Sequence, residues 1–303
     1  AYKDSGVEWI GEIPTGWSVQ RIKNGFTIVA GATPKSNVSE YWGGDIPWIT
    51  PADYSEAQKY VGGGSRTITQ LGLESCGTTL VPENSVIVSN RAPIGLVSIA
   101  SRPLCTNQGC KAIIPSDVNV SSEYLYWYLT TQAETLNSLG RGTTFLELSS
   151  QALNTFFYPR PSVMEQEAIT DYLDTKTGEI DGLIADCERE VELLQEYRKS
   201  VISEAVTKGL DPTVPMKNSG IEWIGRIPEH WNLARIKQAC CKVTDGSHYS
   251  PPVVEDGYPY ITATNIHGRG IDYKSAKLID EQSYTQLEKN GCRPRSGDVL
   301  MVK

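Results

Sequence analysis

Apolar residues in the first half of the chain fall in short clusters separated by glycine and proline. Residues 1–160 contain runs rich in Val, Ile, Thr and aromatic side chains, and these runs are divided by breaks such as Gly62-Gly63-Gly64. Short β-branched runs bounded by such breaks are typical of strands joined by loops. One helix is predicted near Ser121–Leu139, with Ser121 or Ser122 as its N-cap and Glu123 in its first turn. The pattern predicts a loop-rich α+β domain.

The apolar positions change to a heptad pattern between residues 161 and 212. They alternate in steps of three and four over about four heptads flanked by Glu, Asp and Lys, which predicts one long helix with a narrow apolar seam. The helix is expected to begin near Glu165 and to end near Lys208-Gly209, before Pro212. Such a seam needs a partner helix. The predicted seam residues are Leu173, Ile180, Ile184, Cys187, Val191, Leu194 and Val201.

An internal repeat organises the chain. The segment 3–14 recurs as 217–228, each residue 214 positions later. Two weaker matches follow, 46–50 with 258–262 and 84–88 with 297–301. The tryptophans of the repeat are expected to be packing anchors; they are Trp9, Trp17, Trp223 and Trp231.

The repeat and the heptad divide the chain into three regions. We expect a first domain at 1–160, a spacer helix at 161–212 and a second, similar domain at 213–303. The second domain is interpreted as incomplete, because its match to the first stops near the counterpart of Ser89 or Asn90.

Charge is distributed unevenly over these regions. The net charge of -8 would argue against a nucleic-acid partner if it were spread evenly. Residues 161–212, however, carry 5 Lys and Arg against 13 Asp and Glu, whereas 1–160 carry 11 against 13 and 213–303 carry 12 against 10. The acidic excess therefore lies on the spacer, and both domains remain compatible with DNA.

No membrane span, disulfide framework or metal site is predicted. Every apolar run is shorter than the ~18 residues that a span needs, and the N-terminal residues lack a signal-peptide pattern, so a cytoplasmic location is expected. The 7 cysteines form no C-x-x-C pair. They are expected to be reduced and mostly buried.

No motif predicts catalysis. The sequence contains no phosphate-binding, dinucleotide-binding, zinc-protease or nucleophile-elbow motif, and no Asn-Pro-Pro-Tyr or Asp-Pro-Pro-Tyr run of the methyltransferase type. All 3 histidines lie in 213–303. We therefore expect no cofactor, no metal ion and a binding function rather than an enzymatic one.

Polar loop residues of the first domain are suited to binding DNA. Arg can donate two hydrogen bonds to guanine, Asn and Gln can pair with adenine, and Thr, Ser and Lys can hold phosphates. The same residue types also occur in loops that meet only solvent, so composition leaves both interpretations open. The candidates are Thr33, Lys35, Asn37, Asn90, Arg91, Asn107, Gln108, Arg141, Thr143 and Thr144.

Several longer motifs occur along the chain in a fixed order. They are Ser5 to Pro14 with Trp17, Tyr41 to Ile49, Arg91 to Gly95, Asn107-Gln108, Glu165-Gln166, Ile180-Asp181, Tyr197 to Gly209 and Thr244 to His248. This ordered set, which covers nearly all of the chain, resembles the DNA-specificity (S) subunit of type I restriction-modification systems.

The resemblance implies two target-recognition domains, each of which reads one half of a bipartite DNA site, separated by helices that pack antiparallel. It also implies that these helices dock two methyltransferase (M) subunits, which supply the S-adenosylmethionine chemistry, and in the full assembly the ATP-driven restriction (R) subunits. Ser247 and His248 become DNA-binding candidates of the second domain. Because the chain stops within that domain, we expect either a fragment or a shortened subunit that self-associates through the spacer helix.

Two alternatives of other classes stay open at this point. A non-enzymatic repeat scaffold that binds carbohydrate or protein would also explain the tryptophans and the nearly neutral first domain. An enzyme whose catalytic domain is fused outside this sequence is the other. A steep fall of duplex affinity with rising salt would distinguish a DNA-reading protein from the scaffold.

Overall fold

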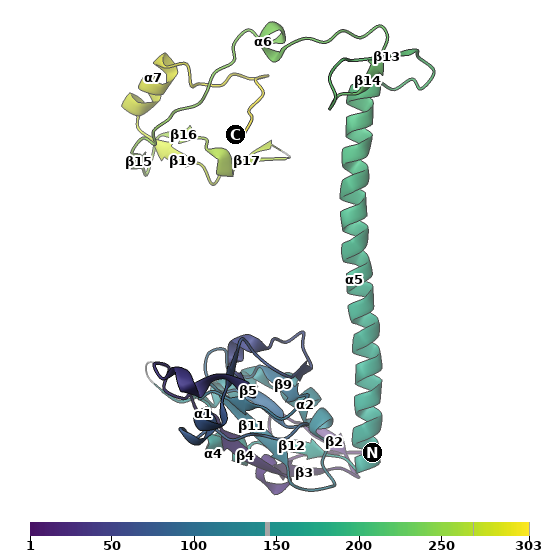
Figure 1. Cartoon of the computed structure of the whole chain (residues 1–303), viewed down its shortest axis with the longest axis vertical. Helices are drawn as coiled ribbons and strands as arrows, with labels where there is room; N and C mark the ends of the chain where they lie inside the picture. Colours follow the sequence, from purple (N-terminus) through teal and green to yellow (C-terminus); the bar gives the residue numbers. More distant parts are fainter. Residues whose placement is uncertain (143–145, 269, 303) are drawn as a thin grey trace. The chain divides into compact units, whose positions relative to one another are not determined.

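The computed structural model describes residues 1–142, 146–268 and 270–302. The chain forms two compact units, residues 1–193 and 194–303, which are described separately. Both contain short strands and short helices, and one long helix, α5 (Val163–Lys208), follows the strands of the first unit (Figure 1). The α+β class predicted from the sequence is confirmed.

A five-stranded sheet forms the centre of the first unit. All neighbouring pairs are antiparallel except β6 with β9. Every residue of β8 and β9 is buried, as expected of strands with a layer on each face. The strand order is β4 (Phe26–Ala30), β11 (Cys110–Pro115), β8 (Val86–Ser89), β9 (Val97–Ala100) and β6 (Tyr60–Val61).

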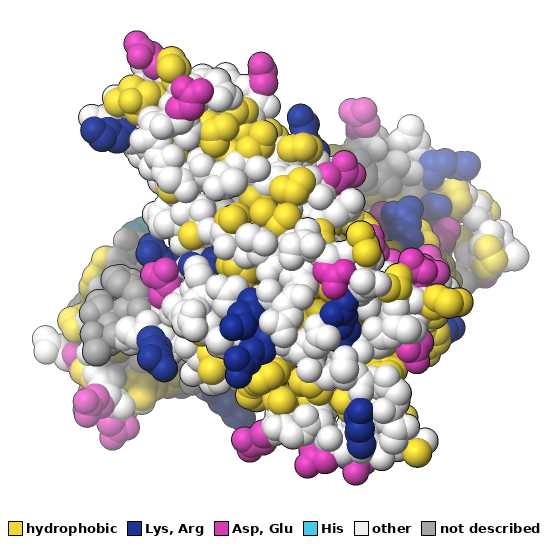
Figure 2. Space-filling view, turned by 90° about the horizontal axis from the view of Figure 1, so that it is seen from below, with side chains coloured by type: hydrophobic (Ala, Val, Ile, Leu, Met, Phe, Trp, Pro, Cys, Tyr) yellow, Lys and Arg dark blue, Asp and Glu magenta, His cyan; other side chains and the backbone are white. Residues whose placement is uncertain are grey.

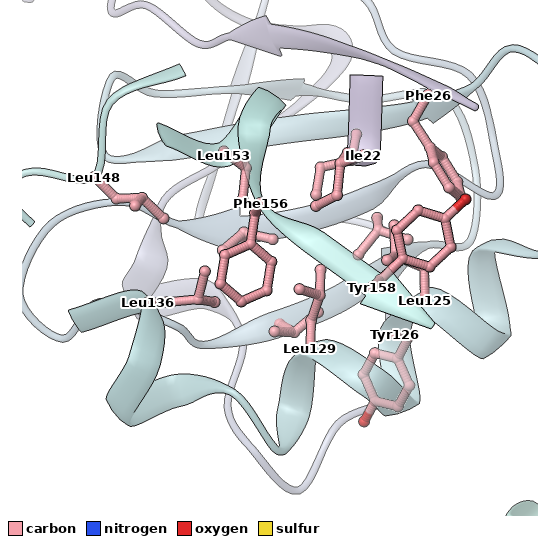
Figure 3. Packing of buried hydrophobic residues seen from close by; sticks show 14 of the residues in the cluster. Ile22, Phe26, Leu125, Tyr126, Leu129, Leu136, Leu148, Leu153, Phe156 and Tyr158 are labelled. Carbon is pink, nitrogen blue, oxygen red and sulfur yellow. The ribbon is translucent and has the colours of Figure 1, made fainter. Parts of the chain in front are cut away.

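One face of this sheet packs against three helices. They are α2 (Ser122–Thr130), α3 (Ala133–Ser138) and α4 (Ser150–Thr155). Leu129 and Leu136 from the helices meet Phe156 in a fully buried cluster, and Phe26 contacts the edge of the Tyr158 ring at 6.1 Å between centroids (Figure 3). Removing such a side chain typically costs about 2–5 kcal/mol, so this cluster stabilises the unit.

The single helix predicted for 121–139 is two helices. Ser121 is the N-cap, as predicted, and its hydroxyl accepts a hydrogen bond from the Tyr124 amide. α2 ends at Thr130 and α3 begins at Ala133. Between them the amides of Thr131 and Gln132 donate to the carbonyls three residues back, at 3.2 and 3.0 Å, instead of continuing the four-residue pattern of the α-helix.

The opposite face of the sheet is covered by a second layer of strands. A three-stranded sheet in the order β10 (Cys105–Thr106), β5 (Trp42–Ile49) and β7 (Arg66–Ile68) lies there. Its pairing register shifts between Trp42 and Ile46, and Gly43 in this bulge has a φ of 79°, a conformation that favours glycine. Trp48 of β5 is buried, at 4% exposed.

Short elements complete the first unit. They are β1 (Tyr2–Asp4), β2 (Glu12–Pro14), β3 (Ser18–Arg21), the 3-10 turns at Ile22–Asn24, Ser39–Tyr41 and Pro51–Asp53, α1 (Gln70–Glu74) and β12 (Phe157–Arg160). β1 pairs with β2 and β3 pairs with β12, each antiparallel.

The long helix confirms the heptad prediction within two residues at its start. Of its 46 residues, Gln166 and Thr170 are the buried ones. Lys208 is its last residue, and Gly209 follows with a φ of 80°. Glycine in this conformation commonly ends a helix.

The second unit reproduces the opening of the first. Its hairpin, β13 (Met216–Asn218) with β14 (Arg226–Pro228), has the same pairing as β1 with β2, 214 positions later. Gly6 and Gly220 both have positive φ, 73° and 78°. The side chains of Asp4 and Asn218 each accept a bond of 2.9 Å from these glycine amides. The predicted repeat is therefore present in the backbone.

The second match of the repeat is also structural. Thr50 and Asp53 form a capping box at one 3-10 turn, and Thr262 and Asn265 form the same box at the turn Ala263–Asn265. The remaining elements are α6 (Ile236–Ala239), β15 (Val253–Val254), β16 (Tyr258–Tyr260), β17 (Ile266–His267), β18 (Gly270–Ile271), β19 (Lys277–Ile279) and α7 (Glu281–Lys289).

The third match, 84–88 with 297–301, is not structural. β8 is buried between β9 and β11, whereas Val299 and Met301 are 93% and 86% exposed and belong to no strand. In the first unit the two neighbours of β8 come later in the chain than β8 itself. The described part of the second unit holds no such neighbours for 299–301.

Two expectations about individual side chains are corrected. Trp9 stacks on Phe156 with centroids 5.3 Å apart, and the Trp17 indole donates to Glu165 at 3.2 Å. The counterpart of Trp9, Trp223, is however 85% exposed, with no ring stacked on it among the described residues. The cysteines are free as predicted but not mostly buried. Cys105 and Cys110 are buried, whereas Cys187, Cys240 and Cys241 are exposed.

None of the helices in the described part of the chain combines the length and the apolar character needed to cross a membrane.

Candidate nucleic-acid interface

Four loops of the first unit meet beyond the ends of β4, β8 and β10. The amide of Ala32 donates to the Thr106 carbonyl at 3.0 Å, and the amide of Asn90 donates to the Gly109 carbonyl at 2.9 Å. The Asn90 carbonyl in turn accepts from the Leu148 amide at 2.9 Å. We call these segments the loop cluster; its described residues are 31–37, 89–91, 106–109, 141–142 and 146–147.

The first two loops are in close contact. The Thr33 hydroxyl donates to the side-chain carbonyl of Gln108. A side chain at Gly31 would overlap Thr106 and Asn107, so this approach requires glycine. Gln108 is exposed beside it, and the Asn107 side chain accepts from the Gly109 amide at 2.9 Å, which fixes the turn.

The other two loops are joined by Glu147. Both Nε and Nη2 of Arg91 donate to its Oε2, at 3.1 and 2.9 Å, and Nδ2 of Asn90 donates to its Oε1 at 3.1 Å. The backbones of Glu147 and Arg141 exchange two further bonds of 3.0 and 3.1 Å. Arg91 and Glu147 are partly exposed, whereas Asn90 is fully buried.

Lys111 lies on the inner side of this group. It is 5% exposed on β11, and burial lowers the pKa of its ammonium. The nearby charge of Glu147 raises this pKa in part, while that of Arg91 lowers it further. The carboxylate of Glu147 therefore offsets the mutual repulsion of two cations.

A stacked arginine extends the cluster on the side of the second layer. The guanidinium of Arg66 lies 3.4 Å from the ring centroid of Trp42. The Trp42 indole donates to the Lys35 carbonyl at 3.2 Å, and the Trp48 indole donates to the Ala32 carbonyl at 3.0 Å. The two indoles thus hold the backbone of the loop that carries Thr33, Lys35 and Asn37.

The remaining DNA-binding candidates predicted from the sequence lie in different surroundings. Lys35 and Asn37 are exposed at the end of their loop. Ser247 and His248 belong to the second unit, where the Ser247 hydroxyl donates to the Tyr249 carbonyl at 2.7 Å and His248 is exposed. Thr143 and Thr144 lie outside the described residues.

The sequence did not indicate Glu147, Lys111 or Arg66. A carboxylate is not a donor to DNA, and its bond to Arg91 spans 56 residues, so no local pattern reveals it. Arg66 could have been inferred only from its pairing opposite Trp48. On the face shown in Figure 2, Lys and Arg side chains lie as separate points among polar and apolar ones (Figure 2).

The first turns of α5 are tied to the first unit by polar contacts. The side chain of Gln166 accepts from the Ser121 amide at 2.9 Å and donates to the carbonyls of Asn119 and Pro161 at 3.2 and 3.1 Å. Asp174 accepts from Lys59 at 2.6 Å and from the Trp127 indole at 2.9 Å. The attachment is therefore specific rather than a simple continuation of the chain.

Beyond these turns the predicted seam is open. Ile180, Ile184 and Val191 are 55%, 51% and 53% exposed, and together with Leu183 and Cys187 they line a shallow hollow along the helix. Leu194 and Val201 are exposed as well, whereas Leu173 is half-buried.

No group of three or more His, Cys, Asp or Glu suited to a metal ion occurs in the part of the chain that the structure describes.

An α+β domain whose loops converge at one end, followed by a long helix with an open seam, defines the class of the first unit. Residues 14–192 match the family model of the type I restriction modification DNA specificity domain. The chain therefore belongs to the family of type I restriction-modification specificity subunits.

Two curated relatives are of this kind. The specificity subunit of the type I restriction enzyme MjaIX from Methanocaldococcus jannaschii is 36% identical over 282 residues, which are 90% of this chain and 63% of the relative. The EcoR124I/EcoR124II specificity subunit from Escherichia coli is 27% identical over 217 residues, 67% of this chain and 49% of the relative. The chain thus spans about half to two thirds of their length.

The fold agrees with solved structures. A chain from a structure of type I R-M complex assembly matches with a TM-score of 0.55 and 24% identity, over 69% of this chain and 49% of that chain. The HsdS subunit from Thermoanaerobacter tengcongensis matches with a TM-score of 0.50 and 23% identity, over 69% of this chain and 48% of that chain.

Proposed function

We propose that the first unit reads one half of a bipartite DNA target through the loop cluster, as the recognition part of a type I restriction-modification complex. The single observation that carries this proposal is the convergence of the loop cluster, whose described residues 31–37, 89–91, 106–109, 141–142 and 146–147 are far apart in the sequence. Each brings residue types that bind base edges or phosphates, and the sheet supplies a rigid support for them.

The candidate residues are assigned different roles according to whether their side chains are exposed or buried. Arg91, Arg141 and Gln108 are the proposed donors to base edges, and Thr33, Lys35 and Asn37 the proposed phosphate contacts. Asn90 is buried and bonded to Glu147, so we assign it to holding the loop, together with Asn107. Thr143 and Thr144 remain candidates by position. Ser247 and His248 are the candidates of the second unit.

The second part of the proposal concerns α5, which we expect to bind the other subunits of the complex. With domains at 1–160, 161–212 and 213–303, the exposed seam of α5 would receive a partner helix, either a second copy of this chain or a second spacer helix. Its flanking acidic face would dock the methyltransferase and restriction subunits. The chain itself is proposed to be non-catalytic, with S-adenosylmethionine bound by the methyltransferase subunit.

A salt titration tests this function. The full chain, alone and with the methyltransferase subunit, is bound to a library of duplexes with a randomised segment, and the affinity for a selected duplex is measured at rising salt. A DNA-reading subunit selects a sequence and loses affinity linearly on logarithmic axes, because bound counterions are released. Failure to select any sequence, or a flat salt dependence, contradicts the proposal and favours a carbohydrate- or protein-binding scaffold.

A further inference from the structure

Glu147 occupies a special place beside Arg91. A guanidinium carries five N–H donors in one rigid plane, arranged along edges that each present two parallel donors. Glu147 accepts from Nε and Nη2, which form the side edge of Arg91. The end edge, formed by Nη1 and the second hydrogen of Nη2, is bonded to no other side chain or carbonyl of the described residues.

That end edge has the geometry of a base reader. Two parallel N–H donors match O6 and N7 of guanine in the major groove, the commonest specific contact between a protein and DNA. A carboxylate beside the arginine repels a nearby phosphate group, because both are negatively charged, but it does not repel a neutral base edge. It also holds the long side chain in one rotamer, so less conformational freedom is lost when the contact forms.

The carboxylate is itself held in place. Asn90 is fully buried and donates to Oε1 of Glu147 at 3.1 Å, so both carboxylate oxygens are engaged. The backbone of Glu147 is fixed by its two bonds to Arg141. An ion pair as exposed as that of Arg91 with Glu147, at 46% and 40% of the side chains, contributes little to stability. Its arrangement is therefore better explained by orientation than by stabilisation.

We propose that Glu147 is a positioning residue that holds Arg91 for a bidentate contact with one guanine of the target. This inference rests on the proposed DNA-reading function and adds a specificity-determining residue to it. Arg91 touches the base, and Glu147 acts through Arg91. A phosphate contact of Arg91 is the competing outcome of the test.

The test compares Glu147→Gln with Glu83→Gln in the full chain. Glu83 is exposed before β8 and makes no ion pair among the described residues, so both changes remove one negative charge. Glutamine keeps the shape of Glu147 and the acceptor for Asn90 but loses the charge-assisted pair. The affinity of each variant is measured for the selected duplex and for duplexes with every base replaced in turn, after thermal unfolding has shown that both variants are folded.

We expect E147Q to lose about tenfold of the preference for guanine at one position, while its affinity for scrambled duplexes stays equal or rises. E83Q should keep the preference. Arg91→Lys keeps the charge but lacks the parallel donors, so it should lose the preference at the same position. Retention of the preference by E147Q or by R91K, or a uniform loss over all sequences, overturns the inference. A wild-type chain that prefers no sequence would instead contradict the proposed function.

Discussion

Lys59 and Asp174 form an ion pair of 2.6 Å that joins the edge of the five-stranded sheet to α5. The same ammonium contacts Glu123 of α2 at 2.7 Å, and Asp174 also accepts from the Trp127 indole. Burial alone would lower the pKa of Lys59, but its bonds to Asp174 and Glu123 raise it above its usual value. The first unit thus holds α5 through charged contacts in addition to the apolar contact of Ile169 with its core.

Asp174→Asn should weaken the attachment of α5 to the first unit. The neutral amide keeps the shape but loses the charge-assisted bond, and since Asp174 is partly exposed we expect a loss of about 1 kcal/mol in the free energy of unfolding. Urea unfolding of the full chain measures it. The control is Asp171→Asn, an exposed carboxylate on the same helix without an ion pair among the described residues. Equal effects of the two variants would show that the pair adds nothing.

Gln166→Ala should cost more. This side chain is 1% exposed and satisfies one amide and two carbonyls of the first unit. Truncation leaves the Ser121 amide and the buried Pro161 carbonyl without this partner, while the Asn119 carbonyl keeps a bond from Arg160 at 3.3 Å, so we expect a loss of about 2–3 kcal/mol. The exposed neighbour Glu167, changed to Ala, is the control in the same urea experiment. A loss no greater than that of the control would contradict the assigned role.

Asp53 should make the free energy of unfolding depend on pH. Burial would raise its pKa, but bonds from the Ser65 and Thr50 amides and the Thr50 hydroxyl lower it below the usual 3.8. A carboxyl whose folded pKa is depressed adds stability above its unfolded pKa and loses it as the pH falls through the folded value. Asn265 forms the same cap in the second unit, so Asp53→Asn should keep the turn.

We expect D53N to be less stable than the wild type by up to about 1 kcal/mol near neutral pH. The gap should close as the pH falls below 3.8. Thermal midpoints of both proteins over a pH series measure this. A gap of constant size at every pH would mean that the charge of Asp53 has no part in the cap.

Because the seam of α5 is exposed, substitutions in it should weaken association without lowering the free energy of unfolding. Ile184→Asn with Val191→Asn changes side chains that are already half exposed, so urea unfolding should be nearly unchanged. Sedimentation of the chain, alone and with the methyltransferase subunit, should show weaker association, because a partner helix would lose apolar contacts. Asp186→Asn lies on the other side of the helix and is the control. Unchanged association of the double variant would exclude the seam as a docking surface.

Local patterns predicted local structure well. The heptad gave α5 because helical periodicity is set by neighbouring residues, and the repeat gave the second hairpin because its turns depend on nearby glycines and Asx side chains. The break after Thr130 was missed because no glycine or proline marks it in the sequence. The packing of Trp223 was predicted wrongly from the repeat. Its counterpart Trp9 packs on Phe156, which lies far from Trp9 along the chain, so the repeated segment itself does not contain the contact.

The candidate site was predictable only as separate loops. Thr33, Arg91 and Gln108 were chosen for their chemistry, but their proximity depends on strand order, which places β4, β11 and β8 side by side. Glu147 was missed for the same reason, because its bonds to Asn90 and Arg91 span 57 and 56 residues. Long-range pairing of this kind leaves no periodic trace in the sequence.

The measurement that tests the central claim most directly is hydrogen exchange of the full chain with and without its selected duplex. If the loop cluster reads DNA, the amides of 31–37, 89–91, 106–109, 141–142 and 146–147 should exchange more slowly in the complex. Those of α1, which belongs to no part of the cluster, should be unchanged. Slower exchange elsewhere in the first unit, with these four segments unaffected, would contradict the account.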